Sequence, residues 1–438
     1  MLFANLLRRR CCSSLPLLLG IVVVLWFCSS HHVAATGSKV EYLPGVQPEG
    51  PLPFELETGY IGVGESEDIQ LFYYFVKSES NPIIDPIVLW ISGGPGCSSF
   101  VAMTEELGPL LFDVPKNNWS LPTLSRNPYS WTKVASFIYL DLPVGTGFSY
   151  AKSSKKYKAN DVETSYHGAE FIRKWFEDHF QYQSNSFYVG GDSYSGITIP
   201  MVVQAISDGI DARFKPLVNL KGYLIGNGVT FLADNMDDTF QTARGFSLVS
   251  LEQYKLGRVY TGEHYYWPDV IGEENDAKRF RGYNVHAFDR HLIFKAALIA
   301  SRWMNHDNVL EALHVRKGCG EKWAKCRLPL LYERTVQDTR PYHANLSTKG
   351  LQISLIYSGN ADLYVTSLAT ETWTKSLNYS VIDDWRPWLI NNRIVGYTRT
   401  FSNNMTYAKI LGSDHIAPTI TPADCFIMFK RWISHEKL

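Results

Sequence analysis

The chain has 438 residues, of which 45% are apolar and 19% charged, a mixture typical of globular proteins and unlike disordered tails or coiled coils. Its 42 Lys and Arg against 43 Asp and Glu give a formal net charge of −1, so no basic surplus favours nucleic-acid binding. The length fits two average domains or one large α/β domain with an insertion.

The first 35 residues have the order of a secretory signal. A basic cluster, Arg8–Arg10, precedes an apolar run from Leu15 to Phe27, and the small residues Val33-Ala34-Ala35 follow. The alternative is a membrane anchor, but this run of 13 residues is shorter than the roughly 20 that a span needs. We therefore expect residues 1–35 to be removed, residues 36–438 to follow the secretory route, and no membrane span to remain.

Two further features agree with a secreted chain. Signal removal leaves an even number of cysteines, which allow three pairings or free buried thiols: Cys97, Cys319, Cys326 and Cys425. Four N-glycosylation sequons begin at Asn118, Asn345, Asn378 and Asn404. No His or Cys pair has zinc-finger spacing, and no phosphate loop or dinucleotide fingerprint occurs, so we expect neither a metal nor a cofactor.

Short apolar runs, several of them β-branched, recur along the chain before Gly-rich turns. We expect strands at Ile69–Val76, Ile87–Ile91, Phe137–Leu142, Phe187–Gly190, Leu220–Ile225, Leu351–Tyr357 and Met405–Ile410. A capping pattern at Asn160 predicts a helix that continues to Phe180. The alternation predicts an α/β fold with a mostly parallel sheet flanked by helices. From about 231 to 329 strand patterns stop, so we expect an inserted, mainly helical cap.

The strongest local motif is Gly190-Gly191-Asp192-Ser193-Tyr194-Ser195-Gly196, at the end of an expected strand. A strand that enters a tight turn before a helix is typical of a nucleophile elbow, in which the serine backbone is strained and its neighbours must be small. Ser195 stands where the strict G-x-S-x-G pattern has its second Gly. Alone, the motif is better explained as an ordinary Gly/Ser turn after a strand.

Two later loops supply the partners that a serine nucleophile needs. Asp362 follows the strand at 351–357, and His415 follows the strand at 405–410. The order Ser, Asp, His is that of α/β-hydrolase triads, and the loops after parallel strands are where such sheets bind ligands. Alone, Asp362 is a turn-capping residue and His415 a surface histidine. Their order and placement together favour a triad of Ser193, Asp362 and His415.

An oxyanion hole needs two backbone N–H groups near the nucleophile. One is expected from Tyr194, the residue after Ser193, and the other from an earlier loop that follows a strand. Ser92-Gly93-Gly94-Pro95-Gly96-Cys97-Ser98-Ser99 is such a loop, and Gly94 is the predicted donor because glycine lets the backbone approach closely.

These motifs, in this order, resemble the serine carboxypeptidase family from about Tyr42 to the C-terminus. The resemblance rests on the GGPGCSS loop, the GDSYSG elbow, the Asp362 and His415 turns and Glu105-Glu106-Leu-Gly-Pro109. Segments such as Asp383-Asp-Trp385-Arg-Pro-Trp388 resemble the plant serine carboxypeptidase-like branch. The resemblance implies an α/β-hydrolase fold, a disulfide between Cys97 and Cys326, and delivery to the vacuole or the cell exterior.

The resemblance leaves two activities open, because both begin with attack of Ser193 on an acyl carbon. In peptidase members a polar set binds the terminal carboxylate of the peptide, and it corresponds here to Ser92, Gly93, Glu106 and Asp192. Peptidases carry an amide side chain at the position of Ser92 and Glu at that of Asp192. Each lost hydrogen bond to a charged group costs roughly 1.5–3 kcal/mol, which disfavours peptides.

Asp at position 192 also resembles plant members that use 1-O-acyl-glucose esters. We therefore expect an acyltransferase that moves an aromatic acyl group from a glucose ester to a hydroxyl acceptor. The alternative is a carboxypeptidase that releases C-terminal amino acids. A catalytically inactive member is a second alternative, since Asp414 replaces the usual Gly before His415, no Cys lies between Cys97 and Cys319, and the segment 281–304 fits the family poorly.

Overall fold

The computed structural model describes residues 37–113, 121–153, 157–231, 236–252, 254, 297–318, 320–327 and 330–438. The expected signal at 1–35, the sequon at Asn118, Cys319 and most of the expected cap, residues 255–296, lie outside the described residues. The described part belongs to one compact unit, Gly37–Leu438.

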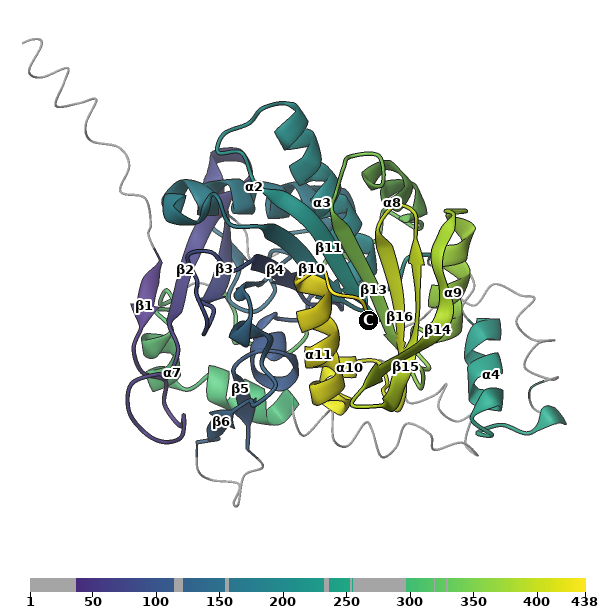
Figure 1. Ribbon diagram of the computed structural model, residues 1–438. Helices are drawn as coiled ribbons and strands as arrows, with labels where there is room; N and C mark the ends of the chain where they lie inside the picture. The colour runs from purple at the N-terminus through teal and green to yellow at the C-terminus, as the bar shows by residue number, and fades with distance from the viewer. Residues whose placement is uncertain are drawn as a thin grey trace, which may run out of the picture. The chain divides into compact units, whose positions relative to one another are not determined.

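A mixed sheet of 12 strands runs through this unit (Figure 1). Its order is β1-β2-β3-β7-β4-β10-β11-β13-β16-β15-β14, and β8 pairs with β3. The strands are β1 (Ser38–Val40), β2 (Leu56–Val63), β3 (Ile69–Val76), β4 (Ile87–Ile91), β7 (Ser136–Leu140), β8 (Tyr150–Ala151), β10 (Phe187–Asp192), β11 (Leu220–Gly226), β13 (Ile353–Gly359), β14 (Val381–Ile390), β15 (Arg393–Phe401) and β16 (Met405–Ile410).

The six central strands, from β7 to β16 in the sheet order, pair in parallel, and the strands toward both edges pair antiparallel. The carboxyl ends of the parallel strands therefore meet at one edge of the sheet, where α/β proteins bind their ligands. Two small ladders, β5 (Leu110–Phe112) with β6 (Leu124–Arg126) and β9 (Ala159–Asn160) with β12 (Tyr332–Glu333), lie outside the main sheet.

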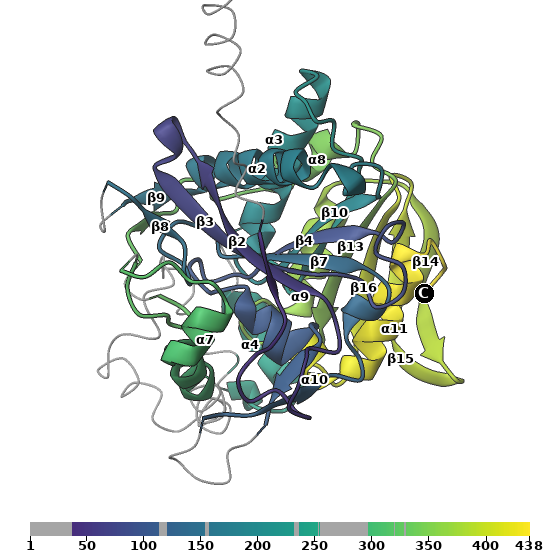
Figure 2. The ribbon, with the colours of Figure 1, turned by 90° about the vertical axis from the view of Figure 1, so that its left-hand side faces the viewer.

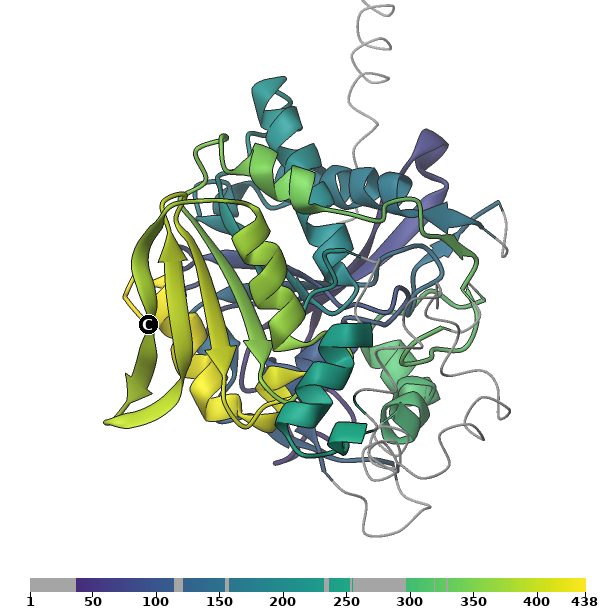
Figure 3. The same ribbon diagram turned by 90° about the vertical axis from the view of Figure 1, so that its right-hand side faces the viewer.

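Helices cover both faces of the sheet. Figure 2 shows α2 (Asp161–Asp178) and α3 (Ser195–Asp211) above the strands, and α10 (Ala417–Ile420) and α11 (Pro422–Ile433) below them. Figure 3 shows α9 (Ser367–Ser376) beside the strands β13 to β16. Other helices in the described part of the chain are α4 (Met236–Gly245), 297–304, α7 (Asp307–Ala312), α8 (Arg340–Leu346), the π-helix η2 (Ala102–Glu106) and the 3₁₀ turns η1 (Glu65–Glu67), η3 (Trp131–Lys133) and η4 (Phe180–Tyr182).

Two hydrophobic cores lie on opposite faces of the sheet. Successive residues of β7 alternate between them: Phe137 and Tyr139 pack in the core of α11, and Ile138 and Leu140 in the core of α2 and α3. A strand buried on both faces reads as a continuous apolar run, which is why the central strands are visible in the sequence. No described helix is long and apolar enough to cross a bilayer.

The expected α/β-hydrolase architecture is confirmed, and β3, β4 and β16 have the expected bounds. Asn160 caps α2 as expected, because its side chain accepts a hydrogen bond from the backbone N–H of Glu163 at 2.9 Å. The prediction that β7 reaches Leu142 is wrong, because the strand ends at Leu140. The carboxylate of Asp141 accepts a hydrogen bond from Ser99 N in the loop after β4, and Pro143 has no N–H to donate to a neighbouring strand. Within the expected cap, the described parts include α4, 297–304 and α7.

Candidate active site

Ser193 lies between β10 and α3 in a strained backbone conformation, with φ of 57°. A non-glycine residue with positive φ is uncommon and needs its surroundings to hold it. The next loop in the sheet holds it here: the Ser193 N–H donates to the carbonyl of Gly226 at 3.0 Å, and its carbonyl accepts from Val229 N at 2.9 Å. This is the geometry of a nucleophile elbow.

The departure from the strict elbow pattern has a structural explanation. A Cβ at Gly191 would lie 2.3 Å from the carbonyl oxygen of Ile91, so only glycine fits there. Ser195, at the second position, is buried, and its hydroxyl donates to the same carbonyl at 2.8 Å. The small hydroxyl side chain therefore links the elbow to the end of β4 instead of obstructing it.

The three predicted triad residues lie together. His415 Nε2 is 2.9 Å from Ser193 Oγ, and His415 Nδ1 is 2.8 Å from Asp362 Oδ2. Asp362 is fully buried, and its Oδ1 accepts from the backbone N–H groups of Tyr364 at 2.7 Å and Val365 at 3.1 Å. Three loops far apart in the sequence thus place a hydroxyl, an imidazole and a carboxylate in one hydrogen-bonded chain.

The imidazole of His415 lies among negative charges. Burial disfavours its charged form, but the carboxylate of Asp362, its hydrogen bond, and the charges of Asp192 and Asp414 outweigh burial and raise the pKa of His415 above its ordinary value. Asp414 does not displace the ring, because the distances to Ser193 and Asp362 are those of ordinary hydrogen bonds. The geometry therefore argues against the expectation that Asp414 inactivates the site by tilting the imidazole.

The two predicted oxyanion donors, Gly94 and Tyr194, lie in segments whose backbones touch. A Cβ at Gly93 would lie 2.7 Å from Tyr194 N and 2.7 Å from the Cβ of Ser193, so the loop after β4 packs directly on the elbow. Gly94 follows with φ of 117°, a conformation that side chains rarely adopt. The predicted loop therefore lies against the backbone nitrogen of Tyr194, the arrangement that a two-donor oxyanion hole requires.

The predicted substrate-binding residues lie in a buried acidic cluster. Ser92, Glu106 and Asp192 are each buried, and each has a side-chain oxygen without a hydrogen-bond partner among the described residues. Burial makes the largest contribution to the raised pKa of Glu106, and the negative charge of Asp192 adds to it. The positive charge of Lys325 opposes the rise. Burial also raises the pKa of Asp192, although His415 and the N–H of Gly93 oppose it. Unpartnered polar atoms in such a cluster are suited to contact a substrate.

A disulfide and a buried carboxylate fix the loop after β4. Cys97 and Cys326 form the expected disulfide. Asp141, fully buried, accepts from Ser98 Oγ at 2.6 Å and from Ser99 N at 3.1 Å. Cys425 is a buried free thiol, one of the outcomes that the sequence left open.

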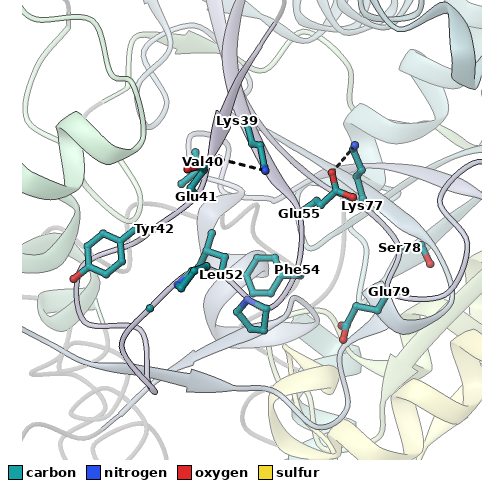
Figure 4. A pocket seen from close by; sticks show the side chains of 13 residues that line it. Lys39, Val40, Glu41, Tyr42, Leu52, Phe54, Glu55, Lys77, Ser78 and Glu79 are labelled. Atoms are coloured by element: carbon teal, nitrogen blue, oxygen red, sulfur yellow. Dashed lines mark hydrogen bonds and ion pairs between the residues drawn. The ribbon is translucent and has the colours of Figure 1, made fainter.

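The other predicted positions lie apart from this cluster. Asn345, Asn378 and Asn404 are exposed, which leaves their sequons accessible. No group of three His, Cys, Asp or Glu in the described part of the chain is arranged to hold a metal ion. A cavity of about 870 Å³ lies between β1 and the segment 50–55, where Lys77 pairs with Glu55 and Lys39 with Glu41 (Figure 4). None of the triad residues lines it.

The model of peptidase family S10, serine carboxypeptidase, matches residues 44–265 and 260–435. The chain belongs to the serine carboxypeptidase family. Serine carboxypeptidase-like 11 of Arabidopsis thaliana is 44% identical over 97% of this chain and 100% of its own length, and serine carboxypeptidase-like 2 is 43% identical over 97% and 98%.

A solved structure shares the fold. A prohormone-processing carboxypeptidase from Saccharomyces cerevisiae superimposes with a TM-score of 0.71 over 91% of this chain and 95% of its own, at 16% identity. The family and its α/β-hydrolase fold make this chain an enzyme of the carboxypeptidase-like type.

Sequence reasoning missed one polar residue at the site, Asn227. It follows β11 directly, and its side-chain amide donates to Asp362 Oδ2 at 2.7 Å. The signal that was available is its position: like Ser193, Asp362 and His415, it comes just after an expected strand of the sheet.

Proposed function

We propose that the protein is a serine-dependent acyltransferase. Ser193 attacks the acyl carbon of a 1-O-acyl-glucose ester while His415 accepts its proton, and the tetrahedral intermediate collapses to acyl-Ser193 as glucose leaves with the proton that His415 returns to its oxygen. A hydroxyl acceptor then gives its proton to His415 and attacks the same carbon, and the acylated product leaves as His415 returns that proton to the oxygen of Ser193. Backbone N–H groups at Gly94 and Tyr194 stabilise the oxyanion of each step.

One observation carries this proposal: Ser193, His415 and Asp362 form a hydrogen-bonded chain that lies beside Asp192 and Ser92. Peptidases of the family carry Glu and an amide side chain at those two positions. The triad supplies the acyl-enzyme chemistry. The shorter Asp192 and the loss of an amide donor at position 92 weaken binding of a terminal carboxylate, each by roughly 1.5–3 kcal/mol per lost hydrogen bond. A neutral ester donor does not need those contacts.

A carboxypeptidase is the second candidate, and the buried acidic cluster favours it. Burial raises the pKa of Glu106 and its Oε2 is unpartnered among the described residues, so burial favours a protonated carboxyl that can donate to a carboxylate. A peptide C-terminus is the ligand that such a donor suits. The choice between the candidates depends on whether Ser92 and Asp192 still contribute to that contact.

Two parallel assays decide between them. The purified protein is incubated with aromatic 1-O-acyl-glucose esters plus alcohols, and separately with blocked dipeptides, and products are identified by mass spectrometry. We expect transfer to exceed dipeptide hydrolysis, and Ser193→Ala to reduce transfer on the order of 10⁶-fold. Rapid release of C-terminal amino acids without ester transfer would reject the proposal. The double variant Ser92→Asn/Asp192→Glu should raise dipeptide hydrolysis by about tenfold or more.

We also propose that the protein reaches the vacuole or the cell exterior through the secretory pathway as a glycoprotein. The order of residues 1–35, the disulfide and the exposed sequons at Asn345, Asn378 and Asn404 support this route. A shift in mass after treatment with a peptide N-glycosidase, and an N-terminus near residue 36 in the purified protein, are the expected results.

A further inference from the structure

Asn227 occupies a backbone position that restricts which residues can stand there. It follows β11, is fully buried and has φ of 44°. Its N–H donates to the carbonyl of Tyr357 on β13 at 2.8 Å, which fixes the main chain beside the next strand. Asn, Asp and Gly tolerate this left-handed conformation best. Conformation alone therefore leaves three residue types open at this position.

The side-chain amide distinguishes among them. Asn227 Nδ2 donates to Asp362 Oδ2 at 2.7 Å, the same oxygen that lies 2.8 Å from His415 Nδ1. Nδ2 also lies 3.3 Å from the carbonyl oxygen of Asp414, and Oδ1 accepts from Gly359 N at 3.3 Å. One amide thus contacts the loop of the carboxylate and the loop of the imidazole, and it needs both its donor and its acceptor to do so.

The backbone around Asn227 contacts the third loop. Gly226 accepts from the N–H of Ser193, and Val229 donates to the Ser193 carbonyl. The segment 226–229 is therefore bonded to all three loops that carry the triad, although residues 227 and 362 are 135 positions apart and residues 227 and 414 are 187 apart.

We propose that Asn227 is a positioning residue for the triad. Its amide holds Asp362 Oδ2 toward His415 Nδ1 and holds the backbone before His415 through the Asp414 carbonyl, so that Nε2 stays directed at Ser193. This inference rests on the proposed function, because it concerns the reactivity of Ser193. A Gly at 227 removes the amide without backbone cost, and an Asp replaces a neutral donor with a second carboxylate beside Asp362.

A fluorophosphonate probe tests the role without knowledge of the natural donor. The labelling rate of Ser193 is measured between pH 4.5 and 8.5 for the wild type, Asn227→Gly, Asn227→Asp and Ser193→Ala. For Asn227→Gly we expect the maximal labelling rate constant to fall about 10- to 100-fold, the effect of one hydrogen bond to a charged group, with unchanged saturation by the probe.

Asn227→Asp supplies a readout that a structural defect does not move. A carboxyl at 227 lies within hydrogen-bond distance of Asp362 Oδ2 in a buried site, so the two carboxyls share a proton, and its loss adds a negative charge beside His415, which already faces Asp362, Asp192 and Asp414. The labelling profile should therefore gain a titration step that the wild type and Asn227→Gly lack. The matched control is Asn185→Ala, which removes a buried amide that donates to the carbonyls of Pro82 and Asp85 away from the site, and it should leave rate and profile unchanged.

The outcomes separate the two proposals. An unlabelled, folded wild type contradicts the serine chemistry itself and, with it, the role of Asn227. A labelled wild type with Asn227 variants of the same rate and pH profile overturns the positioning role alone. Failure of both Asn227 variants to fold, while Asn185→Ala folds, would assign Asn227 to stability and equally overturn it.

Discussion

Asp414 stands directly before His415, where the family resemblance leads us to expect Gly. It is half-buried next to His415, and its charge is one of those that raise the pKa of His415. A general base must be neutral to accept a proton from Ser193, so a raised pKa moves the loss of activity on acidification to higher pH. Asp414 thus changes the pH range of the reaction and leaves the triad geometry intact.

Asp414→Asn should extend activity toward acidic pH. The substitution removes the charge but keeps the side-chain size and the carbonyl that contacts Asn227, so the pKa of His415 should fall. The measurement is the pH profile of kcat/KM, or of fluorophosphonate labelling. Asp384→Asn is the control, because Asp384 is an acid on β14 that pairs with Arg399. An unchanged acid limb in Asp414→Asn would contradict the assignment.

The residues that the sequence made visible share one property. Ser193, Asp362 and His415 each follow an apolar strand, and each has a side chain whose chemistry is specific to acyl transfer. Asn227 occupies an equivalent place, but an amide after a Gly is also an ordinary turn residue. Its function depends on distances to residues more than 130 positions away, which no local pattern encodes.

At the scale of elements, the loop after β4 is held by a distant segment of the chain. Besides the disulfide, Ser98 N donates to the carbonyl of Lys325 at 2.9 Å, and Arg327 N donates to that of Gly96 at 3.0 Å. Gly94 packs against this tether, since a Cβ on it would lie 3.0 Å from Cys97 Sγ. The segment 325–327 therefore supports the predicted oxyanion donor as well as the fold.

The double variant Cys97→Ala/Cys326→Ala should lose both stability and reactivity. The bond joins residues 229 positions apart, and in the chain-entropy model such a loop is worth about 5 kcal/mol of unfolding free energy. For a chain of this size that corresponds to a fall in Tm of about 6 °C. Labelling of Ser193 should slow as well. Cys425→Ala, which removes the buried free thiol, should leave labelling unchanged, and an unaltered Tm in the double variant would contradict the prediction.

Two strands that sequence analysis missed, β14 and β15, lie at one edge of the sheet. β14 and β15 are antiparallel, and β14 is largely exposed, with Asp383, Asp384, Arg386 and Pro387 interrupting its apolar residues. Its pairing with β15 also contains register shifts, so no regular alternation is visible. Strands buried on both faces were predictable because burial dictates their composition. The edge pair forms through backbone pairing with neighbouring strands, which leaves no such pattern in its own sequence.

At the scale of the whole molecule, several buried groups hold protons more tightly in the folded state. Burial raises the pKa of Asp141 to about 7, against the opposing hydrogen bonds of Ser98, Phe148 and Ser99. The pKa of Glu106 is also raised, as is that of His415. Between the unfolded and folded pKa of each group, the unfolded chain binds fewer protons, so the free energy of unfolding falls as pH rises.

Two buried histidines act in the opposite direction, but only at lower pH. Burial lowers the pKa of His343 to about 3 and lowers that of His167 as well. In the unfolded chain they titrate near 6.5, so they reduce stability only as pH falls below that value. Above about pH 6.5 both are neutral in either state, and Asp141, Glu106 and His415 determine the slope.

Stability should therefore decline as pH rises from about 6.5 through the pKa of Asp141 at about 7, by up to about 1.4 kcal/mol per pH unit for each proton that only the folded state retains. Thermal and urea unfolding between pH 5 and 8 measure this slope. Glu106→Gln, which stays neutral throughout, should flatten it by removing one of the titrating groups. A stability that stays constant or rises over this range would show that these groups are not protonated in the folded state. A decline would mean that these buried groups stay protonated in the folded state, which makes the fold more stable at mildly acidic than at neutral pH.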